Sequence, residues 1–122
     1  MRAEKLKGHL DLLLLSVLNG KPGHGYEVIT RLRERSEGSF ELPEGTVYPA
    51  LHRLERAGLL SSGWQVVSGR RRRIYRLTPA GELALADQAR QWREFSGSMA
   101  RVLGTAAWTL PRLSPAGLGG TA

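Results

Sequence analysis

The sequence has no cysteine and few acidic residues, eleven in a chain of 122. Without cysteine there can be neither a disulfide framework nor a thiolate that binds a metal or attacks a substrate. The histidines, His9, His24 and His52, have no metal-ligand residue four positions away and there is no cysteine, so we expect no metal site. The chain also lacks a phosphate-binding glycine loop and the nucleophile motif of the hydrolases. We therefore predict a protein that is not an enzyme and that uses no cofactor.

No apolar run is long enough to cross a membrane. The most apolar stretch lies at residues 10–18, which is too short for a bilayer-spanning helix. Lys5 and Lys7 precede it, as in a secretory signal peptide, but Asp11 interrupts the run and no small-residue cleavage site follows. We expect a cytoplasmic protein with no membrane partner.

The charge balance is strongly basic. Eighteen lysines and arginines give a formal net charge of +7 and a sequence pI near 10.8. Such a balance favours a polyanionic partner, although a basic protein without such a partner is the alternative. The apolar fraction of 41% argues against disorder throughout, and the length suits one domain with a modest core.

Residues 44–58 have the pattern of an amphipathic helix. Val47, Ala50, Leu51, Leu54 and Ala57 recur at the spacing that buries one helix face. Gly58 suits the helix C-terminus because glycine tolerates positive φ.

The opposite face of this helix carries hydrogen-bond donors and cations. Arginine can bond a guanine edge or a phosphate, and threonine, tyrosine and histidine can donate to phosphate oxygens. Glu55 would repel DNA here, so we expect it to turn aside and pair with a nearby arginine. A solvated helix face is the alternative. The predicted DNA-binding residues are Thr46, Tyr48, Pro49, His52 and Arg53.

Residues 60–78 predict a two-stranded ribbon. Trp64 and Val66, and then Tyr75 and Leu77, alternate as in half-buried strands, and Ser68-Gly69 between them is typical of a turn. Residues 70–76 contain five arginines and no acidic residue. Arginines at this density would neutralise DNA phosphates and release bound ions, and one of them could enter a narrow minor groove. A nuclear-localisation or RNA-binding patch is the competing interpretation, but the chain has no aromatic platform for RNA. The predicted contacts are Arg70, Arg71, Arg72 and Arg73.

Together these motifs resemble a known family. EGTVYPALHRLERAGLL, then GW, then GRRRRIYRLTPAG are similar to the PadR family of winged helix-turn-helix transcriptional regulators. GHGYEVITRL resembles the second helix of that family, and the likeness covers roughly residues 8–104. It implies a mainly α fold with a small β-hairpin, and a repressor that binds double-stranded DNA as a homodimer. A winged-helix module that binds protein or RNA remains the alternative.

The resemblance also implies roles for particular segments. It assigns residues 1–78 to the DNA-binding domain and residues 79–104 to one dimerisation helix, as in the compact branch of the family. It implies that Tyr26 begins a helix that touches the DNA backbone, although a core aromatic with a surface hydroxyl is equally consistent. Residues 105–122 are rich in Gly, Ala, Pro and Ser, which predicts a flexible tail.

Two helices have apolar residues beyond the needs of one core. In the first, Leu12 and Leu15 widen the apolar face of residues 10–18. In the last, which Thr78-Pro79 should begin, apolar and small residues recur at spacings of four and three, as in helices that associate. Packing on the chain's own core is the alternative. The predicted dimer interface is Leu12, Leu15, Leu85, Ala89, Trp92, Ser96, Met99 and Leu103.

Trp92 has small neighbours along this predicted seam, Ala89 and Ser96. In a two-fold dimer Trp92 could meet its own symmetry mate and leave space beside the rings, and apolar pockets with aromatic walls are common ligand sites. Some compact relatives bind flat aromatic compounds between their subunits, which this arrangement resembles. A small aromatic effector is therefore the hypothesis, and a Trp92 that simply fills the core is the alternative.

Overall fold

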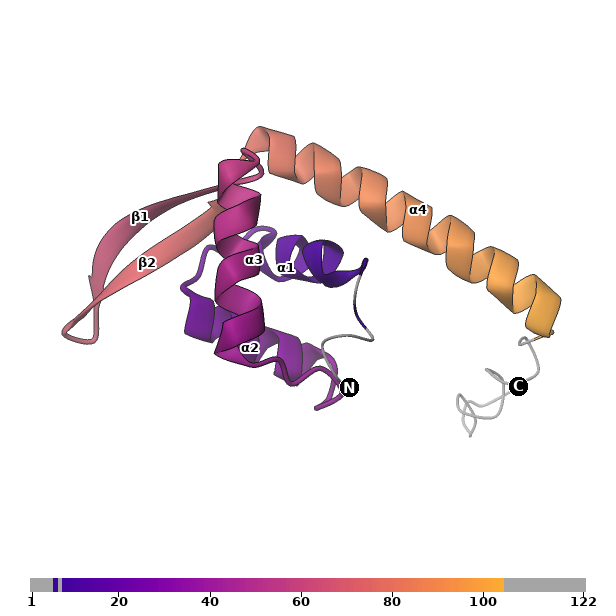
Figure 1. Ribbon diagram of the computed structural model, residues 1–122, viewed down its shortest axis with the longest axis horizontal. Coiled ribbons are helices and arrows are strands. Elements are labelled where there is room, and N and C mark those ends of the chain that lie inside the picture. The colour runs from indigo at the N-terminus through magenta and orange to yellow at the C-terminus, as the bar shows by residue number, and fades with distance from the viewer. Residues whose placement is uncertain (1–5, 7, 105–122) are drawn as a thin grey trace. The chain divides into compact units, whose positions relative to one another are not determined.

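The computed structural model describes residue 6 and residues 8–104 (Figure 1). The described part is mainly helical with one β-hairpin, which confirms the predicted class. The chain divides into two compact units, Met1–Gln88 and Ala89–Ala122. The predicted tail, 105–122, lies outside the described residues. The elements in order are α1 (Leu10–Leu18), α2 (Gly25–Arg35), α3 (Glu44–Arg56), β1 (Leu60–Val67), β2 (Arg70–Leu77) and α4 (Pro79–Leu103).

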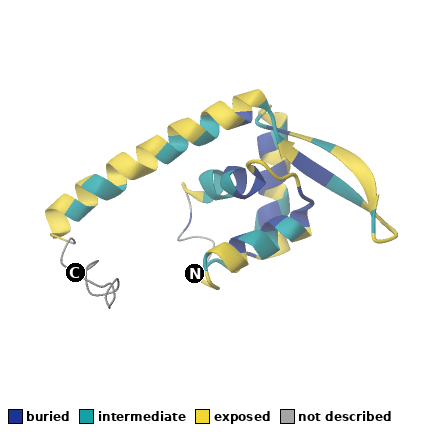
Figure 2. Cartoon of the chain, turned by 180° about the vertical axis from the view of Figure 1, so that it is seen from behind, coloured by how far each residue is buried: buried dark blue, intermediate teal, exposed yellow. Residues whose placement is uncertain are grey.

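The core of the first unit is built from aliphatic side chains of α1, α2 and α3, closed by the base of the hairpin (Figure 2). The predicted apolar face of α3 is buried except for Ala57, which is exposed because it lies at the helix C-terminus. The core residues are Leu6, Leu14, Leu15, Val17, Leu18, Val28, Leu32, Leu42, Val47, Ala50, Leu51, Leu54, Leu60 and Tyr75.

The assignment of Leu15 to a dimer interface is wrong. Its side chain is fully buried in the core of its own chain. The reason is that α1 packs against α2, α3 and β2, and a helix with neighbours on several sides needs a wide apolar surface. Leu12, by contrast, is half-buried.

Short-range chemistry sets the junction between α3, β1 and α4. Gly58 adopts a φ of 81°, as its predicted place at the end of α3 requires. The Thr78 hydroxyl donates to the Gly58 carbonyl at 2.6 Å and accepts from the Gly81 N–H at 3.0 Å, so it caps α4 and ties it to the end of α3. A Cβ at Gly81 would strike the Leu59 carbonyl oxygen, so only glycine fits there.

The hairpin is an antiparallel ribbon that extends from the three-helix core (Figure 1). Ser68 and Gly69 both have positive φ, 52° and 78°, as a two-residue turn of the hairpin type requires. Trp64 and Val66 are 55% and 72% exposed, so their predicted half-burial is wrong. The cause is that the ribbon projects beyond the core, and only its base is covered.

Candidate nucleic-acid interface

The exposed face of α3 is polar and open to solvent. Pro49, His52 and Arg53, from the predicted set, are exposed, whereas Thr46 and Tyr48 are half-buried. Arg56 was not among the predicted residues, yet it is exposed one turn beyond His52. With His52 and Trp64 it lines a groove of about 560 Å³ between α3 and the ribbon. Its spacing of four from His52 was the signal that could have found it.

Tyr48 has a packing role as well as a place near this face. Its ring lies against the start of α2, so closely that a Cβ at Gly25 would strike the ring atoms. Gly25 therefore allows α2 and α3 to cross at short range, and Tyr48 braces that crossing. A tyrosine that packs in this way has only part of its surface left for a ligand.

Arg53 is held by an acidic residue of α1. Its guanidinium donates to the two Asp11 carboxylate oxygens at 3.0 and 2.8 Å, a bidentate ion pair. The hydrogen bond to Asp11 raises the pKa of Arg53, and so its charge is retained. Arg53, a predicted DNA-binding residue, thus has a partner within its own chain. The two residues are 42 positions apart, and no local pattern could have revealed the pair.

Glu55 pairs with an arginine, as predicted, but it also lines the groove that contains His52 and Arg56. Its carboxylate accepts a hydrogen bond from the Ser62 hydroxyl at 2.7 Å and lies 3.6 Å from the Arg73 guanidinium. The Arg73 Nε–H donates to the Ser62 hydroxyl at 2.8 Å. This small network joins α3 to both strands of the ribbon and neutralises the charge of Arg73.

The four consecutive arginines of β2 are divided between the two faces of the ribbon, because side chains alternate along a strand. Arg71 and Arg73 cover the Trp64 ring, with guanidinium carbons 4.6 and 5.3 Å from its centroid. Arg70 and Arg72 have neither an ion pair nor a ring contact among the described residues. The predicted arginine cluster therefore contains two kinds of side chain, those engaged with Trp64 and those that are free.

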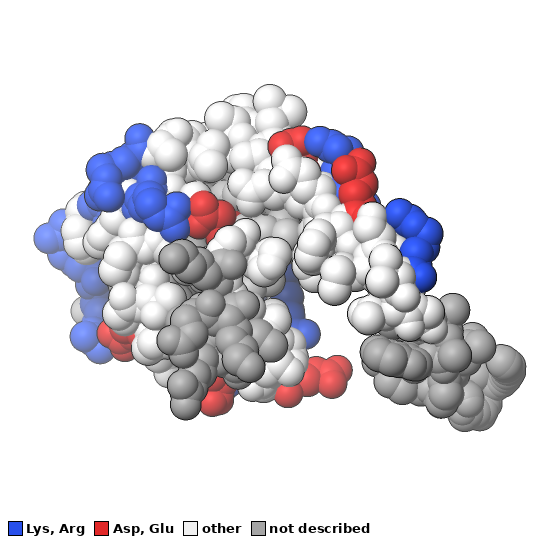
Figure 3. All heavy atoms as spheres, turned by 45° about the vertical axis from the view of Figure 1, so that its right-hand side comes forward, with Lys and Arg blue, Asp and Glu red and all other residues white. Residues whose placement is uncertain are grey.

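Arg72 faces a second groove, of about 390 Å³, between the start of α2 and the turn of the ribbon. Tyr26 lines the same groove and is 55% exposed, so the alternative of a core tyrosine is wrong. Figure 3 shows the largest group of basic side chains at the left of the view. The groove is lined by Lys21, His24, Tyr26, Glu27, Thr30, Arg31, Val67, Ser68 and Arg72.

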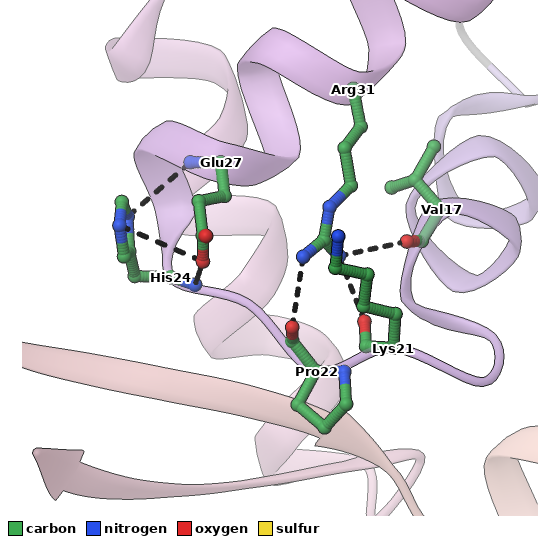
Figure 4. A network of polar contacts seen from close by, with 6 residues as sticks. All are labelled: Val17, Lys21, Pro22, His24, Glu27 and Arg31. Atoms are coloured by element: carbon green, nitrogen blue, oxygen red, sulfur yellow. Dashed lines mark hydrogen bonds and ion pairs between the residues drawn. The ribbon is translucent and has the colours of Figure 1, made fainter.

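A capping box begins α2 at the edge of this groove (Figure 4). His24 Nδ1 accepts a hydrogen bond from the Glu27 N–H at 3.3 Å, and the His24 N–H donates to the Glu27 carboxylate at 3.0 Å. Burial lowers the pKa of His24; the nearby Glu27 charge opposes this, and Arg72 and Arg31 lower the pKa further. His24 is therefore neutral at pH 7, as an Nδ1 acceptor must be.

The second unit contains an apolar stripe along α4. Trp92, Phe95, Met99 and Leu103 are between 44% and 55% exposed, and the rings of Trp92 and Phe95 lie 6.1 Å apart. Ala89 and Ser96, from the predicted seam, are half-buried. Leu85, which begins that seam, instead packs partly against the core of the first unit. Phe95 was missed because it lies beside the strict seam spacing, on its flank.

The described residues offer neither a membrane-spanning helix nor a group of metal ligands. None of the described helices is long and apolar enough to span a bilayer. Across the same residues, no three histidine or acidic side chains gather where a metal ion could be held.

Comparisons with known proteins agree with this geometry. The chain is 48% identical over 64 residues to the transcriptional regulator Rv3488 of Mycobacterium tuberculosis, a match that spans 52% of this chain and 60% of that protein. A PadR family transcription regulator from Clostridium difficile R20291 superposes with a TM-score of 0.70 at 37% identity, covering 78% of this chain and 98% of that one. One from Eggerthella lenta superposes with a TM-score of 0.72 at 31% identity, covering 84% and 88%.

These proteins are described as transcriptional regulators, and the two solved structures share the fold that the motifs predicted. The profile of the Transcriptional regulator PadR-like family matches residues 14–87, which include α2, α3, both strands of the ribbon and the start of α4. The chain belongs to the PadR-like family of transcriptional regulators.

Proposed function

We propose that this regulator is a repressor that binds an inverted-repeat DNA site as a homodimer. The observation that carries the proposal is a set of uncompensated cations beside a polar helix face. Among the described residues, Arg56, Arg70 and Arg72 have no ion pair. Such cations gain free energy from DNA because phosphate contacts release condensed counterions. The exposed Pro49 and His52 lie on the same side of α3 as Arg56.

We assign residues 1–78 to DNA binding. In this assignment α3 enters the major groove, Tyr26 contacts the phosphate backbone, and the ribbon follows an adjacent groove. Arg56 joins the set, whereas Arg73 acts through the ribbon because Glu55 neutralises it. The proposed contacts are Tyr26, Thr46, Tyr48, Pro49, His52, Arg56, Arg70, Arg71 and Arg72, and Arg53 joins them when its ion pair with Asp11 is broken.

We assign residues 79–104 to dimerisation. An aligned apolar stripe is costly in water, and a second copy of the same stripe related by a two-fold axis would cover it. Trp92, Met99 and Leu103 are its exposed members, and Phe95 widens it. In a two-fold dimer the half-site centres would lie about 34–36 Å apart along the DNA, one helical turn.

A small aromatic effector would bind beside Trp92. Ala89 and Ser96 are small neighbours along the helix, and they would leave room for a planar ring between symmetry-related indoles. The test uses a variant with Trp64→Phe and Trp108→Phe, titrated with planar aromatic compounds. Quenching of Trp92 emission together with weaker operator binding is expected. If operator binding is retained and no compound changes the emission, the effector proposal is wrong.

Selection of DNA fragments bound by the whole chain from the host genome, followed by sequencing, tests the function itself. An inverted repeat should emerge, and sedimentation with that duplex should give two chains per duplex. Recovery of unrelated sequences at equal affinity would contradict a specific regulator. Tighter binding to structured RNA than to any duplex would instead support the RNA-binding alternative.

A further inference from the structure

Arg31 joins the C-terminal end of α1 to the turn that leads into α2 (Figure 4). One guanidinium nitrogen donates to the Val17 carbonyl at 3.1 Å and the Lys21 carbonyl at 2.8 Å. The other donates to the Pro22 carbonyl at 2.9 Å. The last carbonyls of a helix have no partner within the helix, and a cation there also suits the helix dipole. Through these three hydrogen bonds the planar guanidinium of Arg31 stabilises the turn at Lys21 and Pro22.

The same turn is bonded to the ribbon. The Gly23 N–H donates to the Tyr75 carbonyl at 3.0 Å, and the Tyr75 N–H donates to the Gly23 carbonyl at 2.8 Å. Gly23 thus acts as a one-residue strand beside β2. The Arg31 guanidinium lies directly over Gly23, where an added Cβ would come within 2.8–3.0 Å of it. Arg31, the turn and β2 form one continuous set of contacts.

We propose that Arg31 is a positioning residue for DNA binding, which holds the ribbon at a set distance from α2 and does not itself contact DNA. This inference rests on the proposed DNA-binding function. Arg31 and Arg72 line the same groove between α2 and the ribbon. With the Gly23–Tyr75 pair held in place, Arg72 keeps its position relative to Tyr26 across that groove. If the turn loosens, the ribbon swings and Arg72 loses its phosphate contact.

Lysine tests this role because it keeps the charge but cannot donate in a planar fork. In Arg31→Lys, affinity for a random-sequence duplex should fall by about eightfold at 0.1 M salt, and the salt slope by about 0.9, the loss of one phosphate contact. Arg33→Lys is the matched control, because the Arg33 side chain is exposed on the same helix and makes no hydrogen bond or ion pair among the described residues. A direct phosphate contact by Arg31 would instead leave the slope unchanged.

A double-mutant cycle separates positioning from general destabilisation. In an Arg72→Ala background, Arg31→Lys should have little further effect, because the contact that it positions is already gone. An equal loss in both backgrounds would overturn the proposal. If Arg31→Lys does not fold, Gly23→Ala replaces it, because its added methyl displaces the end of the Arg31 side chain and leaves the residue in place. Gly23→Ala should reproduce the same loss, and normal binding by this variant would also overturn the proposal.

Hydrogen exchange tests the structural step without DNA. The amides of Gly23 and Tyr75 should exchange faster in Arg31→Lys, while that of Leu51 in the core of α3 should not change. Unchanged exchange at Gly23 and Tyr75 would show that Arg31 does not hold the turn. Failure of the unaltered protein to bind any duplex would refute the proposed function, and the exchange result would still decide the role of Arg31 in the fold.

Discussion

Replacing Arg72 should weaken DNA binding in a way that removing its neighbour Arg73 does not, although both are arginines of one strand. Arg72 has no ion pair among the described residues, so its charge is free to neutralise a phosphate. Arg73 lies 3.6 Å from Glu55 and over the Trp64 ring, so its charge is already compensated. The two side chains lie on opposite faces of the ribbon.

The magnitudes follow from these contacts. One phosphate contact changes the slope of log K against log salt by about 0.9, which at 0.1 M salt is about eightfold in affinity, or about 1.2 kcal/mol. Arg72→Ala should show that loss with little change in stability. Arg73→Ala combined with Glu55→Gln removes the ion pair without changing the net charge, so the slope should not change. It should instead cost stability, about 1 kcal/mol, through the partly exposed ion pair and the cation–π contact.

Fluorescence anisotropy with a labelled random-sequence duplex over a range of salt concentrations measures the slopes, and thermal unfolding measures the stability. Arg33→Ala is the control for net charge, because it removes one exposed cation from α2. The reasoning is refuted if Arg33→Ala lowers the slope as much as Arg72→Ala does. It is also refuted if the combined Arg73 and Glu55 variant loses a full unit of slope.

Asp11→Asn should free Arg53 from its bidentate ion pair and steepen the salt slope on a random duplex by about 0.9; an unchanged slope would mean that Arg53 does not reach DNA. Met99→Asp with Leu103→Asp should convert the proposed dimer to a monomer in sedimentation equilibrium, since charges enter the apolar stripe. A wild-type monomer at micromolar concentration would falsify that interface. Burial lowers the pKa of His24, so the unfolded chain binds a proton first as pH falls. The stability contribution of His24 should be complete above pH ~6.5 and decrease as pH falls through the lowered native pKa. Urea unfolding from pH 7.5 to 5 should show this decrease in the wild type and a smaller one in His24→Asn, which caps without titrating; equal pH dependence would contradict the role of His24.

Local chemistry explains what could be predicted from the sequence. Gly58 sets the C-terminus of α3 and Thr78 sets the N-terminus of α4. Both follow from the sequence, because a positive φ and a side-chain cap involve residues only a few positions apart. The hairpin turn at Ser68-Gly69 has the same local origin. The pairing of Glu55 with an arginine was predictable for a different reason, since an acid on a face of donors and cations has few other stable arrangements.

Other features were decided only by the tertiary structure. Arg53 of α3 pairs with Asp11 of α1. Gly23 forms backbone hydrogen bonds with Tyr75, although most of the sequence of the first unit separates the two residues. The burial of Leu15 depends on how many neighbours surround α1, which the apolar pattern of one helix does not record.

The four consecutive arginines of β2 combine a property that the sequence predicts with one that only the tertiary structure decides. Composition alone predicts that Arg70 to Arg73 form a basic ribbon, because four adjacent cations need an anionic partner or solvent. The difference between the free and the engaged arginines depends on strand alternation and on Trp64, which faces Arg73 across the ribbon. The register of the ribbon follows from its two-residue turn, whereas side-chain packing is a property of the folded chain, because contacts such as Arg53 with Asp11 join residues whose separation in sequence carries no information about them.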